Sequence, residues 1–124
     1  MTDMLHDGMI HLRQQMRAFA ARMVTYRRGT SSVALLATPG LTRFWRDTTG
    51  QMEVWTQMKD WVLDAADLIL DGQAVDPQES DEIIDIQDGV TRIYRVATPA
   101  GDEQPWREID EGALRIHTVL SEKT

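Results

Sequence analysis

The apolar residues of this sequence change their spacing at Met23, and that change limits the possible folds more than any other feature. Upstream of it they recur every three or four residues, which predicts one face of an amphipathic α-helix over residues 2–22. Downstream of it they alternate with polar residues, which is the period of a half-buried β-strand. The helical face consists of Leu5, Met9, Leu12, Met16, Phe19 and Met23. We therefore predict a mainly β chain with an N-terminal α-helix.

Turn residues divide the alternating part into short strands. Arg28-Gly29-Thr30-Ser31 predicts the turn of a hairpin over residues 23–38, which Pro39-Gly40 is expected to end. Asp88-Gly89 predicts another tight hairpin. Short, evenly spaced strands separated by turn signals are typical of a small barrel or sandwich. We expect residues 23–120 to form a small antiparallel β-barrel.

A segment at about 42–55 is expected to protrude as a loop or as a second hairpin. Aromatic residues lie on both sides of its polar sequence Asp47-Thr48-Thr49-Gly50. Aromatic rings near a loop are common anchors of protein interfaces, and a local cluster that stiffens the hairpin is an equally open interpretation. The candidate interface residues of this segment are Phe44, Trp45 and Trp55.

The helical face also has two open interpretations. It packs on the chain's own sheet, or it contacts a neighbouring subunit, because methionine-rich surfaces adapt well to either kind of contact. The candidate interface residues of the helix are Leu5, Met9, Leu12, Met16 and Phe19.

The size of the chain fits one domain over residues 1–124, because two cores would each be too small to be stable. The sequence contains no cysteine, so disulfides, thiolate metal sites and cysteine nucleophiles are excluded for it. No apolar run approaches the ~20 residues that a membrane-spanning helix requires. We expect a soluble cytoplasmic product with no membrane partner.

The three histidines do not predict a metal site. His6 and His11 are five residues apart and would diverge by about 140° around a helix, so they cannot act as a ligand pair. His117 lies on an alternating strand, on a face that we expect to be exposed or to meet a partner.

The remaining polar residues do not predict catalysis. The acidic pairs Asp81-Glu82 and Asp110-Glu111 are expected in polar turns, whereas catalytic carboxylates need contrasting environments that separate their pKa values. The eight glycines are scattered singly and form no phosphate-binding loop. We predict no catalytic, cofactor-binding or metal-ligating residue, and a protein that is not an enzyme.

Charge is distributed unevenly along the chain, which has a net charge of −7. Residues 1–48 hold seven arginines against three aspartates, a balance of +4, whereas residues 49–124 hold six basic against seventeen acidic residues, a balance of −11. Such asymmetry favours oriented docking against other charged surfaces, unless both regions are simply solvated. The acidic part argues against a dedicated nucleic-acid-binding protein.

Several segments, taken in order, resemble a known family. They are 60–68 (DWVLDAADL), 77–84 (PQESDEII), 93–96 (IYRV), 105–107 (PWR) and 114–118 (LRIHT). Together they cover a pattern from about residue 5 to residue 120 that is similar to the head-completion, or head–tail joining, proteins of long-tailed bacteriophages. These families include the stopper proteins.

The resemblance implies a structural protein of the virion neck, made in the host cytoplasm. It implies a helix beside a small β-barrel, assembled as a homo-oligomeric ring of about six or twelve copies. The ring would contact the adaptor and portal proteins and the tail-terminator protein, and double-stranded DNA would pass through it without sequence-specific binding. By the same resemblance, the 42–55 segment would contact a neighbouring ring or the channel. A tail-terminator or tail-tube component and a stand-alone small-barrel binding module remain alternatives.

Overall fold

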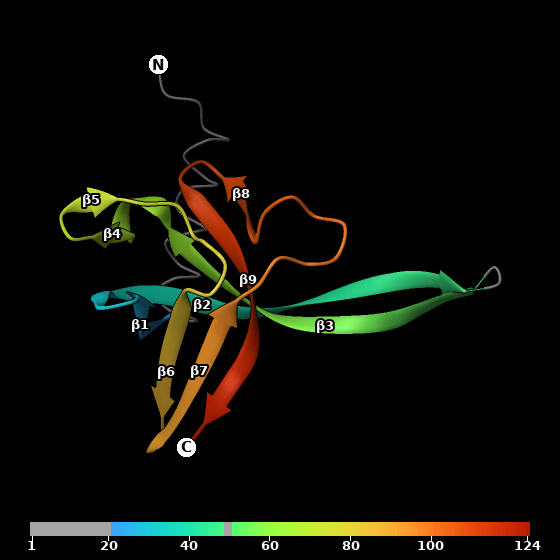
Figure 1. The fold of residues 1–124 in the computed structure, drawn as a ribbon, viewed down its shortest axis with the longest axis horizontal. Coiled ribbons are helices and arrows are strands. Elements are labelled where there is room, and N and C mark those ends of the chain that lie inside the picture. The colour runs from blue at the N-terminus through green and yellow to red at the C-terminus, as the bar shows by residue number, and fades with distance from the viewer. Residues whose placement is uncertain (1–20, 49–50) are drawn as a thin grey trace, which may run out of the picture.

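The computed structural model describes the backbone of residues 21–48 and 51–124, and the side chains of residues 21–41 and 58–124 (Figure 1). The predicted helix over residues 2–22 lies outside the described part, except for its last two residues. Its C-terminal boundary was wrong, because Arg22 already belongs to the first strand.

The described chain is built from strands and one 3₁₀ turn. In chain order, the elements are β1 (Arg22–Arg28), β2 (Ser31–Thr48), β3 (Gln51–Asp64), η1 (Ala65–Asp67), β4 (Ile69–Leu70), β5 (Gln73–Ala74), β6 (Glu82–Gln87), β7 (Val90–Val96), β8 (Trp106–Asp110) and β9 (Ala113–Lys123).

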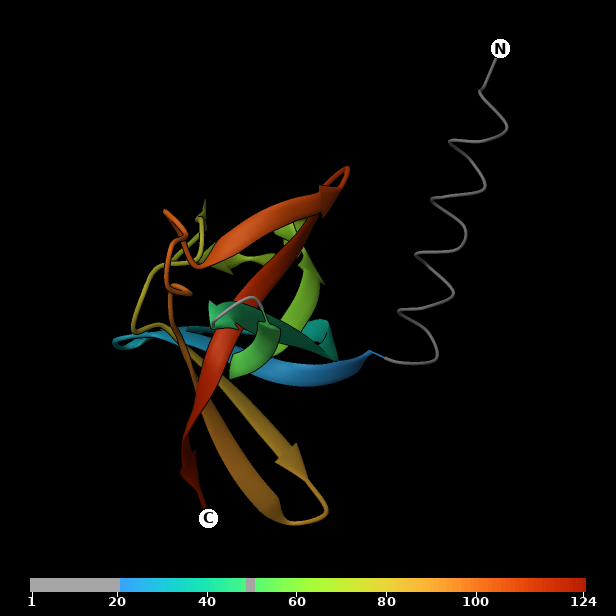
Figure 2. The same cartoon turned by 90° about the vertical axis from the view of Figure 1, so that its right-hand side faces the viewer.

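The main sheet closes into a small antiparallel barrel, as predicted. Its strand order is β3-β2-β1-β6-β7-β9-β8, and an additional pairing of β3 with β9 closes the ring of six strands. In this pairing Trp61 lies opposite Ile116, and Leu63 lies opposite Leu114. Figures 1 and 2 show the barrel from two directions, with the β6–β7 hairpin and the end of β9 extending from it on the same side.

The tight hairpin predicted at Asp88-Gly89 is confirmed between β6 and β7. The φ angles of these two residues are 53° and 78°, which is the backbone of a type I′ turn. Asp71 and Gly72 repeat the same geometry, with φ angles of 53° and 79°, between β4 and β5.

The prediction that Pro39-Gly40 ends a strand is wrong, because β2 runs through both residues. Its neighbour changes there: Ala37 is the last residue that pairs with β1, and Thr38 is the first that pairs with β3. On either side of this point β2 has a paired strand on only one edge, and proline is tolerated in strands that have a free edge.

The outer parts of β2 and β3 form a long two-stranded arm that projects from the barrel (Figure 1). The pairing runs from Thr38 opposite Val62 to Thr48 opposite Gln51, with an irregularity between Phe44 and Trp45. A β-bulge of this kind increases the local twist of a ribbon. The segment expected at about 42–55 therefore lies in paired strands, with residues 49 and 50 outside the described part.

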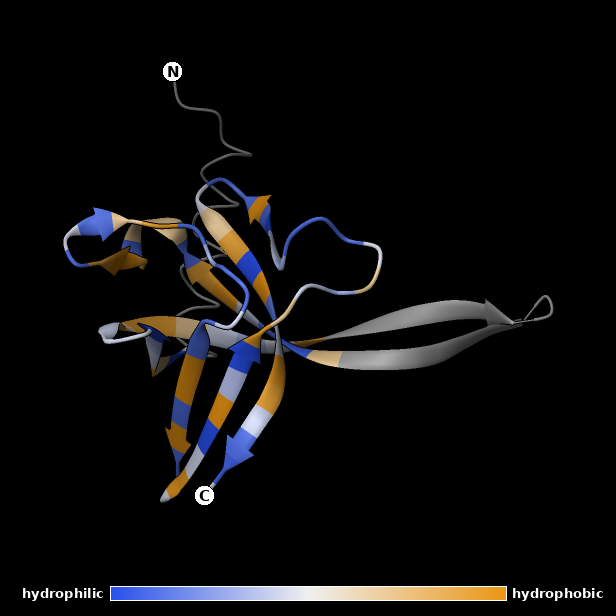
Figure 3. Cartoon of the chain, viewed as in Figure 1, coloured by the Kyte–Doolittle hydropathy of each residue, from blue (hydrophilic) through white to orange (hydrophobic). Residues whose placement is uncertain are grey.

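The hydrophobic core lies inside the barrel. Figure 3 shows the alternation of apolar and polar residues along β6, β7 and β9 that produces it. Trp61 is fully buried, and its ring meets Tyr94 edge-on with the ring centroids 5.4 Å apart. The other large, fully buried apolar side chains are Tyr26, Leu63, Leu68, Ile83, Val96 and Ile116.

Strand β9 has two successive neighbours along one edge. Its second half pairs with β7 and its first half with β8. His117 lies where they exchange: its N–H donates to Pro105 at 2.8 Å, and its carbonyl accepts from Ala97 at 3.1 Å. The loop between these two residues is thus fixed at both ends by one residue of β9.

Candidate functional site

The structure positions some of the predicted interface residues by their backbone only. Phe44 and Trp45 lie on β2 and Trp55 on β3, all in the arm. In the register of this hairpin, Trp45 pairs with Val54. The helical candidates Leu5, Met9, Leu12, Met16 and Phe19, together with His6 and His11, lie outside the described residues. Their role in an interface stays a prediction.

A row of apolar residues on the outer face of the barrel was not predicted as a surface. Met23 on β1 lies directly opposite Leu36 on β2, and their exposed fractions are 56% and 36%. Farther along the sheet, Ile84 on β6 pairs with Ile93 on β7. Ile86, two residues beyond Ile84 on the same face, has an exposed fraction of 62%. Alternation with inward-facing core residues places each of these residues on the outer face, but the strand order that brings them together is not a local signal.

One end of the barrel interior is occupied by charged side chains. Arg22 donates two hydrogen bonds to the buried Asp85, at 3.1 Å from Nε and 2.6 Å from Nη2. The guanidinium carbon of Arg22 lies 5.5 Å from the centre of the Trp61 ring, and Nζ of Lys59 lies 5.6 Å from the same ring. Cations at this distance are attracted by the negative face of indole. The buried carboxylate of Asp85 therefore has a charged hydrogen-bond partner, and two cations lie beside the Trp61 ring of the core.

A second buried carboxylate lies near the other end of β1. Asp81 accepts hydrogen bonds from the Tyr26 hydroxyl and from Nε and Nη2 of Arg28, the latter two at 2.9 and 2.8 Å. Burial and the hydrogen bond to Asp81 raise the pKa of Tyr26 well above its ordinary range. The same hydrogen-bonded carboxylate raises the pKa of Arg28. The prediction that Asp81 is a solvated turn residue is wrong, because these partners hold it inside.

His117 is also buried, which contradicts the expected exposed face. Its exposed fraction is 3%, and its Nδ1 atom lies 2.9 Å from Oδ1 of the fully buried Asp60 on β3. Nη1 of Arg115 lies 3.6 Å from the other oxygen of Asp60. Simple alternation missed this arrangement, because three consecutive residues of β9, from Ile116 to Thr118, are all buried.

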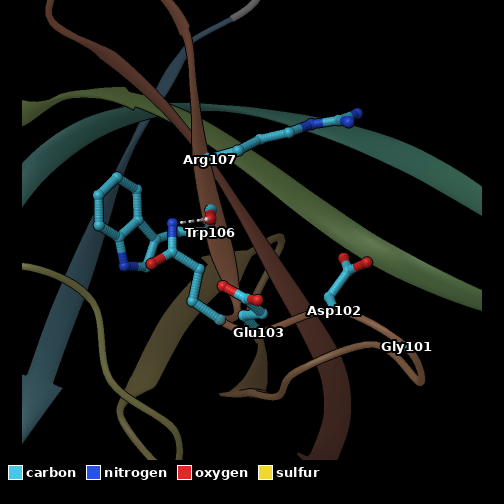
Figure 4. A pocket seen from close by; sticks show the side chains of 6 residues that line it. Gly101, Asp102, Glu103, Trp106 and Arg107 are labelled. Atoms are coloured by element: carbon cyan, nitrogen blue, oxygen red, sulfur yellow. Dashed lines mark hydrogen bonds between the residues drawn. The ribbon is translucent and has the colours of Figure 1, made fainter.

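The loop that leads into β8 borders a shallow hollow of about 470 Å³ (Figure 4). Its side chains spread apart, and the hydrogen bond drawn there joins Nε2 of Gln104 to the carbonyl of Trp106 at 2.9 Å. The lining residues are Gly101, Asp102, Glu103, Gln104, Trp106 and Arg107. No nucleophile and base are paired among them, so the hollow offers no catalytic arrangement.

Within residues 21–41 and 58–124, whose side chains the structure describes, no three or more His, Asp or Glu side chains are grouped in a way that could hold a metal ion. The same part of the chain has no helix with the length and hydropathy needed to cross a membrane. The described part of the chain has three other features: a projecting arm, an excess of acidic residues over 49–124, and an exposed apolar row.

Comparison with protein families identifies the chain. Residues 2–124 match the family described as "Phage head-tail joining protein". This chain belongs to the phage head-tail joining protein family. The comparisons with curated proteins and with solved structures gave no match.

Membership of this family confirms the resemblance that was based on the order of several sequence segments along the chain. A head-tail joining protein is a structural component of a phage virion, and it acts as a connector through contacts with other head and tail proteins. Because such a protein works by contact, its functional surfaces are those that remain free for neighbours. The arm and the outer apolar row are the two candidates that the described residues provide.

Proposed function

We propose that this head-tail joining protein forms a ring at the neck of a tailed phage, between the portal–adaptor assembly and the tail. The observation that carries the proposal is the family match over residues 2–124. A ring requires head-to-tail contacts between two different surfaces of each copy. Copies would number about six or twelve, in keeping with ring symmetries of cyclic type.

The arm supports a role in contacting a neighbouring protein. Residues 42–57 contain two arginines and two acidic residues, so this part of the arm has no net charge. A DNA-gripping arm would need an excess of basic residues to neutralise phosphates. Three aromatic residues, Phe44, Trp45 and Trp55, provide instead the large apolar side chains that anchor protein interfaces.

The charge of the C-terminal part of the chain supports passage of DNA without binding. Residues 49–124 carry the balance of −11, and a negative wall repels phosphates at distances up to about a Debye length. DNA inside such a ring would slide without sequence-specific contacts. The ring would help retain packaged DNA by closing the space around it, and would let it move on ejection.

A phage that lacks this gene, complemented in trans, tests the proposal. The test variant lacks the outer arm: a two-residue Asn-Gly turn replaces Arg43–Gln57. This turn joins Thr42 to Met58, which are register partners. Because the pairing of β3 with β9 begins at Lys59, the variant chain keeps the complete barrel. We expect it to fold as a monomer and to give heads that fail to join tails and lose DNA. Normal infectious titre with this variant would contradict a role for the arm.

The stage of assembly separates the neck from the tail end. In a lysate blocked in tail assembly, a neck protein is expected on purified DNA-filled heads. In a lysate blocked in head assembly, a tail-terminator or tail-tube protein is expected on free tails. Recovery of the chain on free tails alone would replace the neck proposal with the tail one, and its absence from both would favour a stand-alone binding module.

A further inference from the structure

The apolar row on the outer face crosses four neighbouring strands. Leu36 on β2 faces Met23 on β1. The register of β1 with β6 places Thr25 opposite Ile84, so Ile84 is the diagonal neighbour of Met23. Ile84 in turn faces Ile93 on β7. Four adjacent strands span about 14 Å in the hydrogen-bonding direction, since neighbours lie about 4.8 Å apart. An apolar surface of this width matches roughly nine residues of a helix at about 1.5 Å per residue.

The row begins where the apolar spacing of the N-terminal sequence ends. Met23 is the last residue of the spacing that starts at Leu5, and it is also the residue of β1 that lies opposite Leu36. The 20 residues before the described part therefore supply a segment whose apolar side chains are spaced like a helix face. Such a face needs an apolar partner, and the outer row is a surface of that chemistry.

We propose that the outer face of β2, β1, β6 and β7 receives the N-terminal segment of the adjacent copy in the ring. This inference rests on the proposed ring. It gives each copy the two different surfaces that a head-to-tail contact requires: the segment over residues 2–19 on one side, and the row around Met23, Leu36 and Ile86 on the other.

Two features favour the adjacent copy over the chain's own segment. Arg22 is fixed by its two hydrogen bonds to Asp85, which leaves only residues 20 and 21 for a reversal after Phe19. A segment that reversed there and ran back along β1 would also pass over the ion pair of Arg27 with Glu82, in which Nη2 lies 2.7 Å from Oε1. An apolar helix face over that pair would cover charged groups, which costs free energy.

Cross-linking of assembled particles tests the docking directly, because the chain has no cysteine of its own. Particles are assembled from a mixture of two full-length variants, Met16→Cys and Leu36→Cys, and treated with a short bis-maleimide. The control mixture pairs Met16→Cys with Asp102→Cys, which lies in the exposed loop after β7. We expect a dimer of the two chains in the first mixture, at least tenfold more abundant than in the control.

A yield in the first mixture equal to the control overturns the proposal. It is also overturned if the double variant Met16→Cys with Leu36→Cys gives a closed monomer and no dimer, because the segment then docks on its own chain. Particles assembled in parallel from wild-type chain are the reference. If the wild-type chain is missing from those particles, the proposed neck function fails. If it is present there but the variant mixture gives no cross-link, only the docking fails.

A second measurement uses exposed positions whose substitution leaves the core intact. Ile86→Glu puts a charge into the row, and Ile69→Glu puts one on β4, where the exposed fraction is 43%. We expect both variants to keep the melting temperature of the wild-type monomer. Ile86→Glu is expected to lower incorporation into particles at least tenfold, and Ile69→Glu to leave it unchanged. Wild-type incorporation of Ile86→Glu would contradict docking at this face.

Discussion

Arg22, the first residue of β1, donates hydrogen bonds from Nε and Nη2 to the two carboxylate oxygens of Asp85 on β6, at 3.1 and 2.6 Å. Asp85 is fully buried, whereas the arginine side chain is partly exposed. The pair joins the start of the barrel to its fourth strand in sheet order, directly beside the ring of Trp61. It therefore fixes the point from which the N-terminal segment leaves the barrel.

Substitution of Asp85 by alanine is expected to destabilise the fold strongly. Arg22 would keep its charge beside the core without its two acceptors. Because its side chain is partly exposed, we expect a loss in the range of hydrogen bonds to charged groups, about 1.5–3 kcal/mol. Glu82→Ala is the matched control, because both side chains of its pair with Arg27 are partly exposed, and a salt bridge near the surface contributes about 0–1 kcal/mol. Urea unfolding of the two variants measures the difference. Equal free energies of unfolding would show that the Arg22 pair has no special weight.

The sequence predicted the barrel because its signals were local. Asp88-Gly89 requires positive φ angles at two successive residues, and the structure has both. Strand β8 was missed, because its residues are partly or largely exposed and do not alternate. The length of β2 was missed for another reason: Pro39 normally ends a strand, but here the strand exchanges one neighbour for another beside it.

Both tyrosines of the chain are expected to resist ionisation. Burial, with the hydrogen bond to Asp81, raises the pKa of Tyr26, and burial with the negative charge of Asp85 raises that of Tyr94. A raised folded-state pKa contributes stability that is complete below the unfolded value of about 10 and falls as the pH rises above it. Absorbance of phenolate near 295 nm should therefore remain low above pH 10 and rise together with unfolding, followed by circular dichroism. Tyrosinate formed around pH 10 in a folded chain would contradict this burial.

The Trp61 ring is expected to contribute more through its volume than through its nitrogen. Trp61→Ala should cost about 3–5 kcal/mol, the usual range for loss of a large core aromatic residue. Trp61→Phe should cost less, because the indole Nε1 has no hydrogen-bond partner among the described residues and an unsatisfied donor is removed. Thermal or urea unfolding compares the two variants. A larger loss in the phenylalanine variant would require a partner for Nε1.

The aromatic residues of the arm are expected to act in assembly and not in folding. We predict that Trp45→Ala and Trp55→Ala leave the monomer folded, because the barrel closes at residues nearer its body. Each should abolish incorporation into particles, since interface anchors of this type commonly contribute 2 kcal/mol or more, on the order of a thirtyfold change in affinity. Ile109→Ala, on the outer strand β8, serves as the control variant. Normal incorporation of both tryptophan variants would remove the arm from the interface.

The candidate surfaces could be predicted only in part. The resemblance of segments such as 77–84 and 114–118 indicated the family, which the match over residues 2–124 confirmed. Spacing alone could not place Asp81 or His117, because their burial depends on Tyr26, Arg28 and the loop ends that distant parts of the chain bring to them. The outer row depends on strand order, which local periodicity does not specify.

Asymmetric cryo-electron microscopy of the neck in purified virions would show whether this chain works by fitting against neighbouring subunits. We expect a ring of six-stranded barrels between the portal–adaptor assembly and the tail, with the β2–β3 arm of each copy in contact with an adjacent protein. Virions that lack the chain, or that carry it away from the head–tail junction with the arm free in solvent, would contradict it.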